Sequence, residues 1–432
     1  MRPFLFLLAI ATLTAGLTVT AAPATAAAAT CNGVPATIEA SGVPRIDGTE
    51  GRDVIVADDV NAVHALGGDD LICLTGSTPT FLDAGAGDDV VVASGRTGRT
   101  TAHLGEGDDT YVGSTSRDDV DAGTPGGIDS GRDVVATGPA GDEEDFVTSG
   151  EPGLPNPDDI TAGWMTLSWA GVPTATSKAR GGTGSSFALR AGRITRLRID
   201  VPARSLTLAG SSRALALRGF TVFGLSAPRD LERFTFRGSR RGETLLVPAA
   251  GTAVVRAAMG GGADTMQVGT YARGSSLSGG DGRDVIDVLS PTHLDLDLRE
   301  ERLVKRAGGR VVTIEVNGFE DAFVRANTAQ LIGTRGPNKL STDACRTRIE
   351  GLGGRDRLRA FDETGFGRDG RKCMGQDRIT AHLFGGPGND TLQGSRARDL
   401  LIGGTGRDRA DGNPGRDTCQ AEVRRSCEVV RR

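Results

Sequence analysis

The sequence predicts an all-β fold in which short parallel strands coil into a solenoid, as in a β-roll or β-helix. A nine-residue phrase is repeated four times without insertion or deletion between Gly385 and Gln420, and a strict period is typical of a solenoid. The 432 residues include 64 glycines but only 4% aromatic residues, which disfavours a large aromatic-cored enzyme domain. Short stretches of alternating apolar and polar residues, bounded by Gly, Ser and Pro, are typical of strands.

The repeated phrase reads GGPGNDTLQ, GSRARDLLI, GGTGRDRAD and GNPGRDTCQ. Paired glycines permit positive φ angles and sharp turns, and the last three residues form a short strand with one inward aliphatic side chain. These inward residues are Leu392, Leu401 and Ala410. One unit is therefore half a coil, and two units return the chain above its start. Stacking places Asp390 over Asp408 at one edge and Asp399 over Asp417 at the other.

This stretch resembles the RTX, or hemolysin-type, calcium-binding repeat with the pattern GGxGxDxUx. The resemblance implies a parallel β-roll in which Ca²⁺ lies between stacked turns, held by the aspartate at position six and by backbone carbonyl oxygens. Ca²⁺ accepts about 6 to 8 oxygen ligands in adaptable geometry. The alternative is a turn whose aspartate makes only a local hydrogen bond and holds no metal.

Looser forms of the phrase recur before Val135 and after Gly260. The predicted metal-binding aspartates are Asp53, Asp70, Asp89, Asp109, Asp133, Asp264, Asp284, Asp356, Asp390, Asp399, Asp408 and Asp417. The predicted site glycines are Gly279, Gly280, Gly282, Gly385, Gly386, Gly388, Gly403, Gly404 and Gly406. Asn338 stands where an aspartate is expected and carries no charge, so it is not included.

Four segments are predicted along the chain. Residues 1–29 resemble a signal peptide, because Arg2 precedes an apolar run from Phe4 to Val19 that is short for a membrane span. Residues 30–140 and 259–432 are predicted to form RTX-like β-rolls. Residues 141–258 largely lack the phrase and are either solenoid with degenerate turns or a β-rich insert beside it. A secreted, extracellular protein, associated with the cell surface or free of it, is expected.

Six cysteines in an exported chain predict three disulfides, with 15 connectivities open from sequence alone. Proximity suggests the pairs Cys31–Cys73, Cys345–Cys373 and Cys419–Cys427. The first and last pairs would close the two ends of the solenoid. Zinc is the alternative, but no CxxC pair or Cys/His ligand spacing occurs.

The sequence favours a calcium-binding repeat protein that is not an enzyme. It contains no HExxH motif and no GxSxG elbow, and it has only four histidines and two tyrosines. The net charge of −5 argues against nucleic acid as a partner. Calcium ions are the predicted ligand, and a cell envelope, matrix or glycan is the expected further contact. The alternative is a lyase- or epimerase-like β-helix enzyme acting on polysaccharide, with its groove in the central segment.

Overall fold

The computed structural model describes residues 28–123, 131–139, 141–190, 192–226, 230–248, 253–269, 271–361 and 380–430. Within these ranges every regular element is a strand, and no helix occurs. The described residues accordingly contain no helix that is long and apolar enough to cross a membrane. The predicted signal peptide falls almost wholly outside the described residues.

The strands fall into three runs along the chain. The first run comprises β1 (Thr30–Cys31), β2 (Val34–Pro35), β3 (Ile38–Ser41), β4 (Arg45–Asp47), β5 (Val54–Asp58), β6 (Ala62–His64), β7 (Leu71–Thr75), β8 (Thr80–Ala86), β9 (Val90–Val92), β10 (Thr100–Glu106), β11 (Thr110–Val112), β12 (Asp118–Asp121) and β13 (Val134–Ala136). The central run comprises β14 (Asp145–Ser149), β15 (Pro155–Asn156), β16 (Asp159–Thr161), β17 (Met165–Ala170), β18 (Val172–Pro173), β19 (Lys178–Arg190), β20 (Arg196–Asp200), β21 (Ser205–Leu208), β22 (Ala214–Ser226), β23 (Arg233–Arg237), β24 (Thr244–Val247) and β25 (Val254–Gly262). The last run comprises β26 (Thr265–Val268), β27 (Ser276–Gly282), β28 (Val285–Leu289), β29 (His293–Asp297), β30 (Arg302–Ala307), β31 (Arg310–Asn317), β32 (Asp321–Ile332), β33 (Lys339–Glu350), β34 (Arg357–Phe361), β35 (Thr380–Pro387), β36 (Thr391–Gln393), β37 (Leu400–Thr405), β38 (Arg409–Asp411), β39 (Thr418–Gln420), β40 (Val423–Arg425) and β41 (Val429–Val430).

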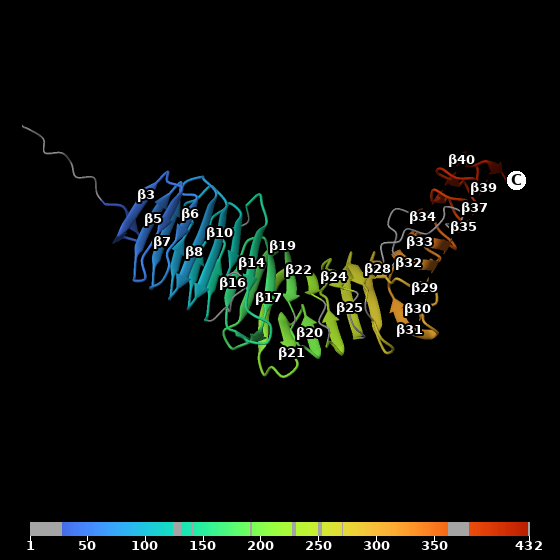
Figure 1. Cartoon of the computed structure of the whole chain (residues 1–432). Coiled ribbons are helices and arrows are strands. Elements are labelled where there is room, and N and C mark those ends of the chain that lie inside the picture. The colour runs from blue at the N-terminus through green and yellow to red at the C-terminus, as the bar shows by residue number, and fades with distance from the viewer. Residues whose placement is uncertain are drawn as a thin grey trace, which may run out of the picture.

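The strands stack in parallel, and each coil contributes two of them. One face of the solenoid runs through β5, β7, β9, β11 and β13, and the other through β6, β8, β10, β12 and β14. In the C-terminal array β36 pairs with β38 and β37 with β39, which confirms two nine-residue units per coil. Figure 1 shows the result as an elongated, bent stack with the first and last coils at opposite ends.

The core is a column of inward side chains, to which every coil contributes. On one face Ile55 aligns with Ile72, then with Val91 and Tyr111, and all four are fully buried. The predicted inward residues of the C-terminal array are also buried: Leu392, Leu401 and Ala410. Burial of one such aliphatic side chain contributes roughly 1.5–3 kcal/mol, so each added coil supplies its own share of core.

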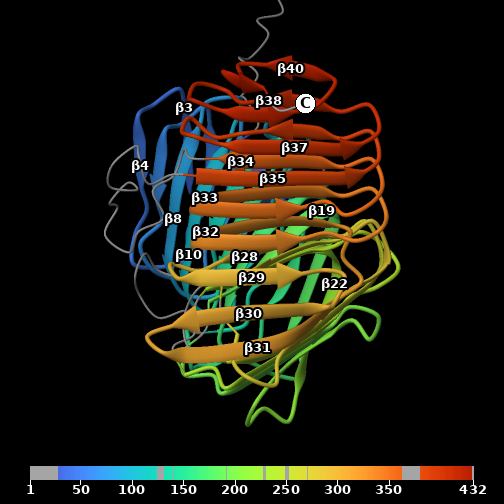
Figure 2. The same cartoon turned by 90° about the vertical axis from the view of Figure 1, so that its right-hand side faces the viewer.

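The central segment continues the solenoid, which selects the first of the two alternatives for residues 141–258. Parallel pairing passes from β13 through β16, β19, β22 and β24 to β26. Two antiparallel excursions interrupt it. One pairs β21 with β20 and β22, and the other pairs β30 with β29 and β31. Figure 2 shows β29, β30 and β31 side by side below the C-terminal coils.

Disulfides close both ends, as predicted. Cys31 in β1 is bonded to Cys73 in β7, and Cys419 in β39 is bonded to Cys427 just after β40. Cys345 is also disulfide-bonded, while its predicted partner Cys373 lies outside the described residues. The first bond spans 42 residues and the last spans 8.

Removal of either terminal disulfide should loosen its own end and leave the other end unchanged, because each coil contacts only its neighbours. Loop-closure entropy predicts a loss of about 4 kcal/mol for Cys31→Ser/Cys73→Ser and about 2.5 kcal/mol for Cys419→Ser/Cys427→Ser. Amide hydrogen exchange of the two double variants checks both the size and the location. Equal loosening of both ends by either variant would contradict a solenoid whose ends are held independently.

Candidate metal centre

All twelve predicted metal-binding aspartates are buried. Each lies just before a strand, at the corner where the chain turns inward. Their exposed fractions run from 0% to 5%: Asp53, Asp70, Asp89, Asp109, Asp133, Asp264, Asp284, Asp356, Asp390, Asp399, Asp408 and Asp417. Burial of a carboxylate costs several kcal/mol unless its charge is compensated, so these corners need partners.

One oxygen of each carboxylate is used in a ladder between coils. Oδ1 of Asp408 accepts the backbone N–H of Asp390 at 2.8 Å, and Oδ1 of Asp417 accepts that of Asp399 at 2.8 Å. The predicted stacking at both edges is therefore confirmed. The same bond, from the backbone N–H of one aspartate to Oδ1 of another, joins six further pairs: Asp53 to Asp70, Asp70 to Asp89, Asp89 to Asp109, Asp109 to Asp133, Asp264 to Asp284, and Asp356 to Asp390.

The second oxygen, Oδ2, separates ten of the twelve turns into two classes, and Asp109 and Asp133 are assigned to neither. In the first class Oδ2 is buried and has no hydrogen-bond partner among the described residues. This class comprises Asp70, Asp89, Asp264, Asp284, Asp356, Asp390, Asp408 and Asp417. A buried acceptor left without a partner loses its full solvation, so these eight atoms mark the places where a cation would be stabilised most.

In the second class a hydroxyl residue four positions earlier satisfies Oδ2. Asp53 accepts the N–H and the hydroxyl of Thr49 at 2.8 and 2.9 Å. Asp399 accepts the same two groups of Ser395 at 2.6 and 3.0 Å. At Asp53 and Asp399 the second oxygen thus already accepts hydrogen bonds from the protein, which distinguishes these two turns from the open ones.

The backbone at that earlier residue, the second of the unit, decides the class. It has positive φ before every carboxylate of the first class, at Leu66, Gly85, Gly260, Gly280, Leu352, Gly386, Gly404 and Asn413. Thr49 and Ser395 do not have positive φ, and their N–H groups point at the carboxylate. A left-handed residue turns its N–H away, which leaves Oδ2 open.

The first glycine of each unit makes room at the open oxygen. A Cβ at Gly385 would lie 2.4 Å from Oδ2 of Asp390 and 2.4 Å from the carbonyl oxygen of Gly403 in the next coil. A Cβ at Gly403 would lie 2.3 Å from Oδ2 of Asp408. Neither glycine has positive φ, so the expectation that both members of a glycine pair turn the chain is wrong for the first member. Its role is close approach.

The remaining predicted glycines carry the turn itself. Gly280, Gly282, Gly386, Gly388, Gly404 and Gly406 have φ between 103° and 152°. A Cβ at Gly388 would lie 1.5 Å from the carbonyl oxygen of Gly354 in the adjacent coil. Gly279 belongs with the close-approach glycines, since its Cβ would meet the carbonyl oxygen of Gly318 at 2.0 Å. The glycines thus bring carbonyl oxygens of neighbouring coils to each open carboxylate.

This oxygen-only environment fits Ca²⁺. The described residues contain no group of three or more His, Cys, Asp or Glu side chains placed so that they could hold a metal ion by themselves. An ion between turns would therefore draw on backbone carbonyl oxygens beside one or two carboxylates. Hard cations with adaptable geometry accept such a set. The residues that would hold Ca²⁺ are the eight open aspartates and the glycine turns that flank them.

Burial also shifts the titration of the open carboxylates. Burial raises the pKa of Asp89 to about 7, against the opposing effect of the N–H that Asp70 donates, and the nearby charges of Asp109 and Asp70 raise it further. Burial likewise raises the pKa of Asp70 to about 6 and that of Asp417 to about 7. Without a cation, burial therefore opposes the ionisation of these groups.

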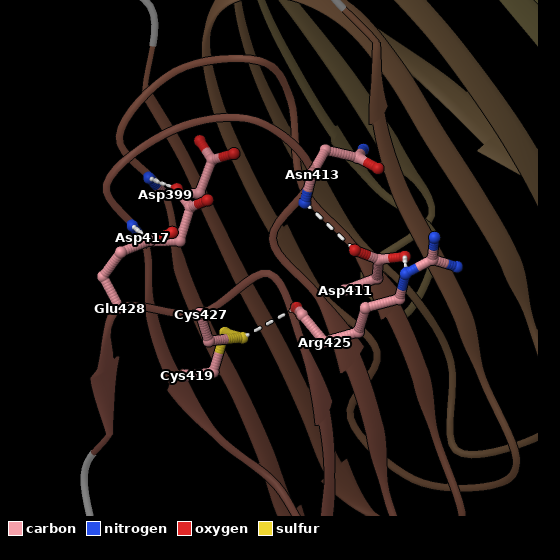
Figure 3. Close-up of a disulfide and its surroundings, with 8 residues drawn as sticks. All are labelled: Asp399, Asp411, Asn413, Asp417, Cys419, Arg425, Cys427 and Glu428. Atoms are coloured by element: carbon pink, nitrogen blue, oxygen red, sulfur yellow. Dashed lines mark hydrogen bonds and ion pairs between the residues drawn. A yellow bond between two sulfur atoms is a disulfide. The ribbon is translucent and has the colours of Figure 1, made fainter.

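Several ladder members lack the glycine phrase, and sequence reasoning missed them. Glu320, Glu422 and Glu428 accept the N–H groups of Asp284, Asp408 and Asp417, respectively. Figure 3 shows Glu428 below Asp417 and Asp399, next to the terminal disulfide. Each of these glutamates takes the place of the next aspartate in the ladder. Their positions after a complete repeat unit could have indicated this role from the sequence.

Carboxylates also occur at the second edge of the N-terminal roll, outside the predicted metal-binding turns. Asp118 donates its N–H to Oδ1 of Asp145 and accepts the hydroxyl of Tyr111 and the N–H of Ser114. Oδ2 of Asp145 accepts the hydroxyl of Thr137. Ser114 stands four residues before Asp118, so this turn belongs to the hydroxyl-capped class.

Arg96 supplies a built-in cation at that edge. Its side chain is 2% exposed, and its guanidinium donates to the carbonyl oxygens of Thr75 and Thr78 and to the hydroxyl of Thr80. These acceptors belong to the preceding coil. The Arg96 guanidinium thus links two coils at this edge, whereas the opposite edge of the same roll carries the open carboxylates.

With the ladder and its open oxygens established, the molecule is defined as a parallel β-solenoid with acidic glycine-rich turns. Residues 384–419 match the family model of the RTX calcium-binding nonapeptide repeat in four copies. The chain therefore carries RTX calcium-binding repeats in its C-terminal array. A search of curated proteins finds no match to this chain.

The metal-free protein should lose stability as pH rises. The folded pKa values of Asp70, Asp89 and Asp417 lie above the usual aspartate value of about 3.9, so the folded state binds more protons than the unfolded state. Their stabilising contribution is complete below pH ~4 and is lost as pH rises through about 6 to 7. Thermal unfolding in chelator between pH 4.5 and 8 should show a falling melting temperature, and added Ca²⁺ should remove the fall. A melting temperature that rises with pH in chelator would contradict buried, uncompensated carboxylates.

Arg96→Gln should destabilise the N-terminal roll by roughly 1–3 kcal/mol, because buried acceptors of the preceding coil lose their donor. Arg96→Lys should rescue it only in part, since an ammonium cannot reproduce the planar fork. Arg99→Gln is the matched control, because Arg99 is about half exposed and pairs with Asp119 at the surface. Chemical denaturation in chelator measures all three variants. Equal losses for Arg96→Gln and Arg99→Gln would rule out the bridging role.

Proposed function

We propose that this protein is an exported, non-enzymatic calcium-binding solenoid whose turns order when Ca²⁺ enters between them, and whose stiff surface then contacts a cell envelope, matrix or glycan. The observation that carries the proposal is the buried, unpartnered Oδ2 at eight turns, at five of which a glycine lies against that oxygen. Two of these carboxylates, Asp70 and Asp89, lie in residues 30–140. The other six lie in residues 259–432, namely Asp264, Asp284, Asp356, Asp390, Asp408 and Asp417.

Coupling of metal to folding follows from the charge of these turns. Without metal, each ladder stacks buried carboxylates about one strand spacing apart, ~4.8 Å, and their repulsion opposes folding. Ca²⁺ between coils turns that repulsion into attraction. Extracellular sites with Kd of about 10⁻⁴–10⁻³ M would fill outside the cell and stay empty in a calcium-poor cytoplasm.

Export is supported by the apolar N-terminal run and by the disulfides. Bonds such as Cys31–Cys73 and Cys419–Cys427 persist in oxidising compartments. Both bonds close terminal coils, where a solenoid is most prone to fraying. A protein that folds on meeting extracellular calcium and is then fixed at its ends would be stable only outside the cell.

The non-enzymatic part of the proposal rests on how the candidate catalytic groups are used. Tyr111 is buried and donates to Asp118, and Tyr271 is 5% exposed. A hollow does occur in the central segment, with Glu243 as its buried acid, which is the feature that favours the polysaccharide-active alternative. Both carboxylate oxygens of Glu243 are held by Ser239, so this acid is engaged in the turn. Release of oligosaccharides from an acidic polysaccharide would support the enzyme instead.

Asp390→Asn tests the proposal directly. The amide retains an acceptor for the N–H of Asp356 and removes the uncompensated charge, so the variant should be more stable than the parent in chelator. It should also lose one Ca²⁺ site in isothermal titration, and with it about 1.4 kcal/mol of stabilisation at a tenfold excess over Kd. Asn338 shows that the scaffold accepts this arrangement, because its amide donates to the carbonyl oxygen of Glu320 and accepts the N–H of Thr334.

Asp399→Asn is the matched control, with the same change in a hydroxyl-capped turn. It should lower stability in chelator, because Ser395 loses a charged acceptor, and it should leave the number of bound Ca²⁺ unchanged. Titration with Mg²⁺ should give little heat with either variant or the parent, since Mg²⁺ demands octahedral geometry. Identical calcium stoichiometry in the parent and in Asp390→Asn would remove the basis of the proposal.

A further inference from the structure

The central coils carry a concentration of positive charge that calcium binding does not explain. Between residues 190 and 256 the sequence contains thirteen arginines, no lysine and four acidic residues, a net charge of +9 in a chain of net charge −5. The remainder of the chain is therefore strongly acidic. Segregation of this kind is not required by the solenoid, whose acidic turns need cations rather than a separate basic segment.

Four of these arginines lie on one outer face of the sheet. In the parallel register of β20, β23 and β25, Arg196 lies beside Arg233, and Arg198 is separated from Arg256 only by Thr235. All four arginines are exposed. Like charges side by side on a sheet are destabilising, so this face carries a cost that a bound anion would remove.

At the end of the same strands the surface is hollowed. One cavity of about 420 Å³ is lined by Arg204, Arg218 and Arg241 together with Thr221 and Ser239. A second, of about 710 Å³, shares Pro202 and Ser239 with the first and adds Arg237, Arg240, the glycines 260–262 and one acid, Asp281. The shared residues make one continuous groove, which opens where the ladder stops at Glu243.

The groove arginines are available to a ligand. Among the described residues, the guanidinium groups of Arg204, Arg218 and Arg240 make no salt bridge or hydrogen bond, and all three side chains are exposed. Arg241 is also exposed, and its only acidic neighbour is the buried Glu243, whose carboxylate is held by Ser239. Arg237 approaches Asp200 no closer than 3.9 Å. Guanidinium forks bind carboxylate and sulfate groups through two parallel hydrogen bonds, which a lysine cannot do.

We propose that this arginine groove, formed by Arg204, Arg218, Arg237, Arg240 and Arg241, binds a linear polysaccharide that carries carboxylate or sulfate groups. These five guanidinium groups come from β22, from the end of β23 and from the turns beside them, so that they line the groove and suit an extended chain with repeated anionic groups. Thr221, Ser239 and the open backbone of Gly260–Gly262 offer hydrogen bonds to sugar hydroxyls. This inference specifies the glycan contact proposed above and is independent of the calcium sites.

The groove fits this ligand better than other polyanions. Single strands of nucleic acid are held by bases stacked on exposed aromatic rings, and the aromatic residues lining the groove, Phe220 and Phe223, are 4% and 1% exposed. Anionic membranes are bound by basic residues together with inserted apolar side chains. The exposed large apolar side chains of the described residues all lie outside the groove.

The test is binding of the calcium-loaded full chain to polygalacturonate and to heparin, measured by isothermal titration at two salt concentrations. Neutral dextran, single-stranded DNA and vesicles with an anionic headgroup serve as comparison probes. Arg218→Gln/Arg241→Gln should weaken polysaccharide binding about tenfold or more, and the parent's affinity should fall as salt rises. Arg357→Gln/Arg409→Gln, which removes two exposed arginines of the C-terminal coils, should leave it within about twofold.

Calcium titration of the groove variant separates this inference from the calcium proposal, because its Ca²⁺ stoichiometry should equal that of the parent. The arginine groove is refuted if the parent binds neither acidic polysaccharide, or if the two double variants lose affinity equally. It is also refuted if DNA or vesicles bind more tightly than the polysaccharides. In each of these cases the calcium sites would be unaffected.

Discussion

The open oxygen of the stacked aspartates is the constraint on which the rest of the structure depends. Each coil buries a carboxylate at its corner and uses Oδ1 to hold the N–H of the preceding coil, as in the 2.8 Å bond from Asp390 to Asp408. That bond fixes the register between coils, and the carboxylate must be buried to make it. The second oxygen, Oδ2, is then buried as well, whether or not a group of the protein binds it. Turns in which no group of the protein binds Oδ2 have a buried charge that is not compensated.

Four arrangements coexist at the edges of the coils in this chain. Thr49 and Ser395 satisfy the second oxygen with a hydroxyl and an N–H, and Asn338 replaces the charge by an amide. Arg96 brings a protein cation to an edge between coils. Eight turns have positive φ at the second residue of the unit and leave the oxygen to an external ion. The open and the capped turns differ in one backbone angle, because the second residue of the unit has positive φ at the eight open turns and not at Thr49 or Ser395.

The sequence predicted the coil, its two edges and the buried aspartates, because a strict period allows only one stacking. Leu392 and Leu401 were correctly placed inside, and the terminal disulfides were found from proximity alone. The distinction between open and capped turns was not predicted, although its signal was present in Ser395. The distinction depends on the direction of one backbone N–H, and the residue type does not determine that direction. Leu66 and Leu352, for example, adopt positive φ at the position where the repeat pattern has glycine. The arginine groove was also missed, because net charge over the whole chain hides a basic segment between two acidic ones.

The core of the central coils differs from that of the coils with stacked aspartates. There the core changes from aliphatic to aromatic: Phe187 packs edge-on against Phe220, and Phe223 packs against Phe236. Aromatic side chains bury more area than the aliphatic residues of the outer coils, and such ring pairs add about 0.5–1.5 kcal/mol beyond that area. The middle of the solenoid thus has a core with more aromatic packing than its flanks. If Ca²⁺ binds between the acidic turns as proposed, the central segment depends on it least, and its aromatic core offsets the repulsion of its own arginines.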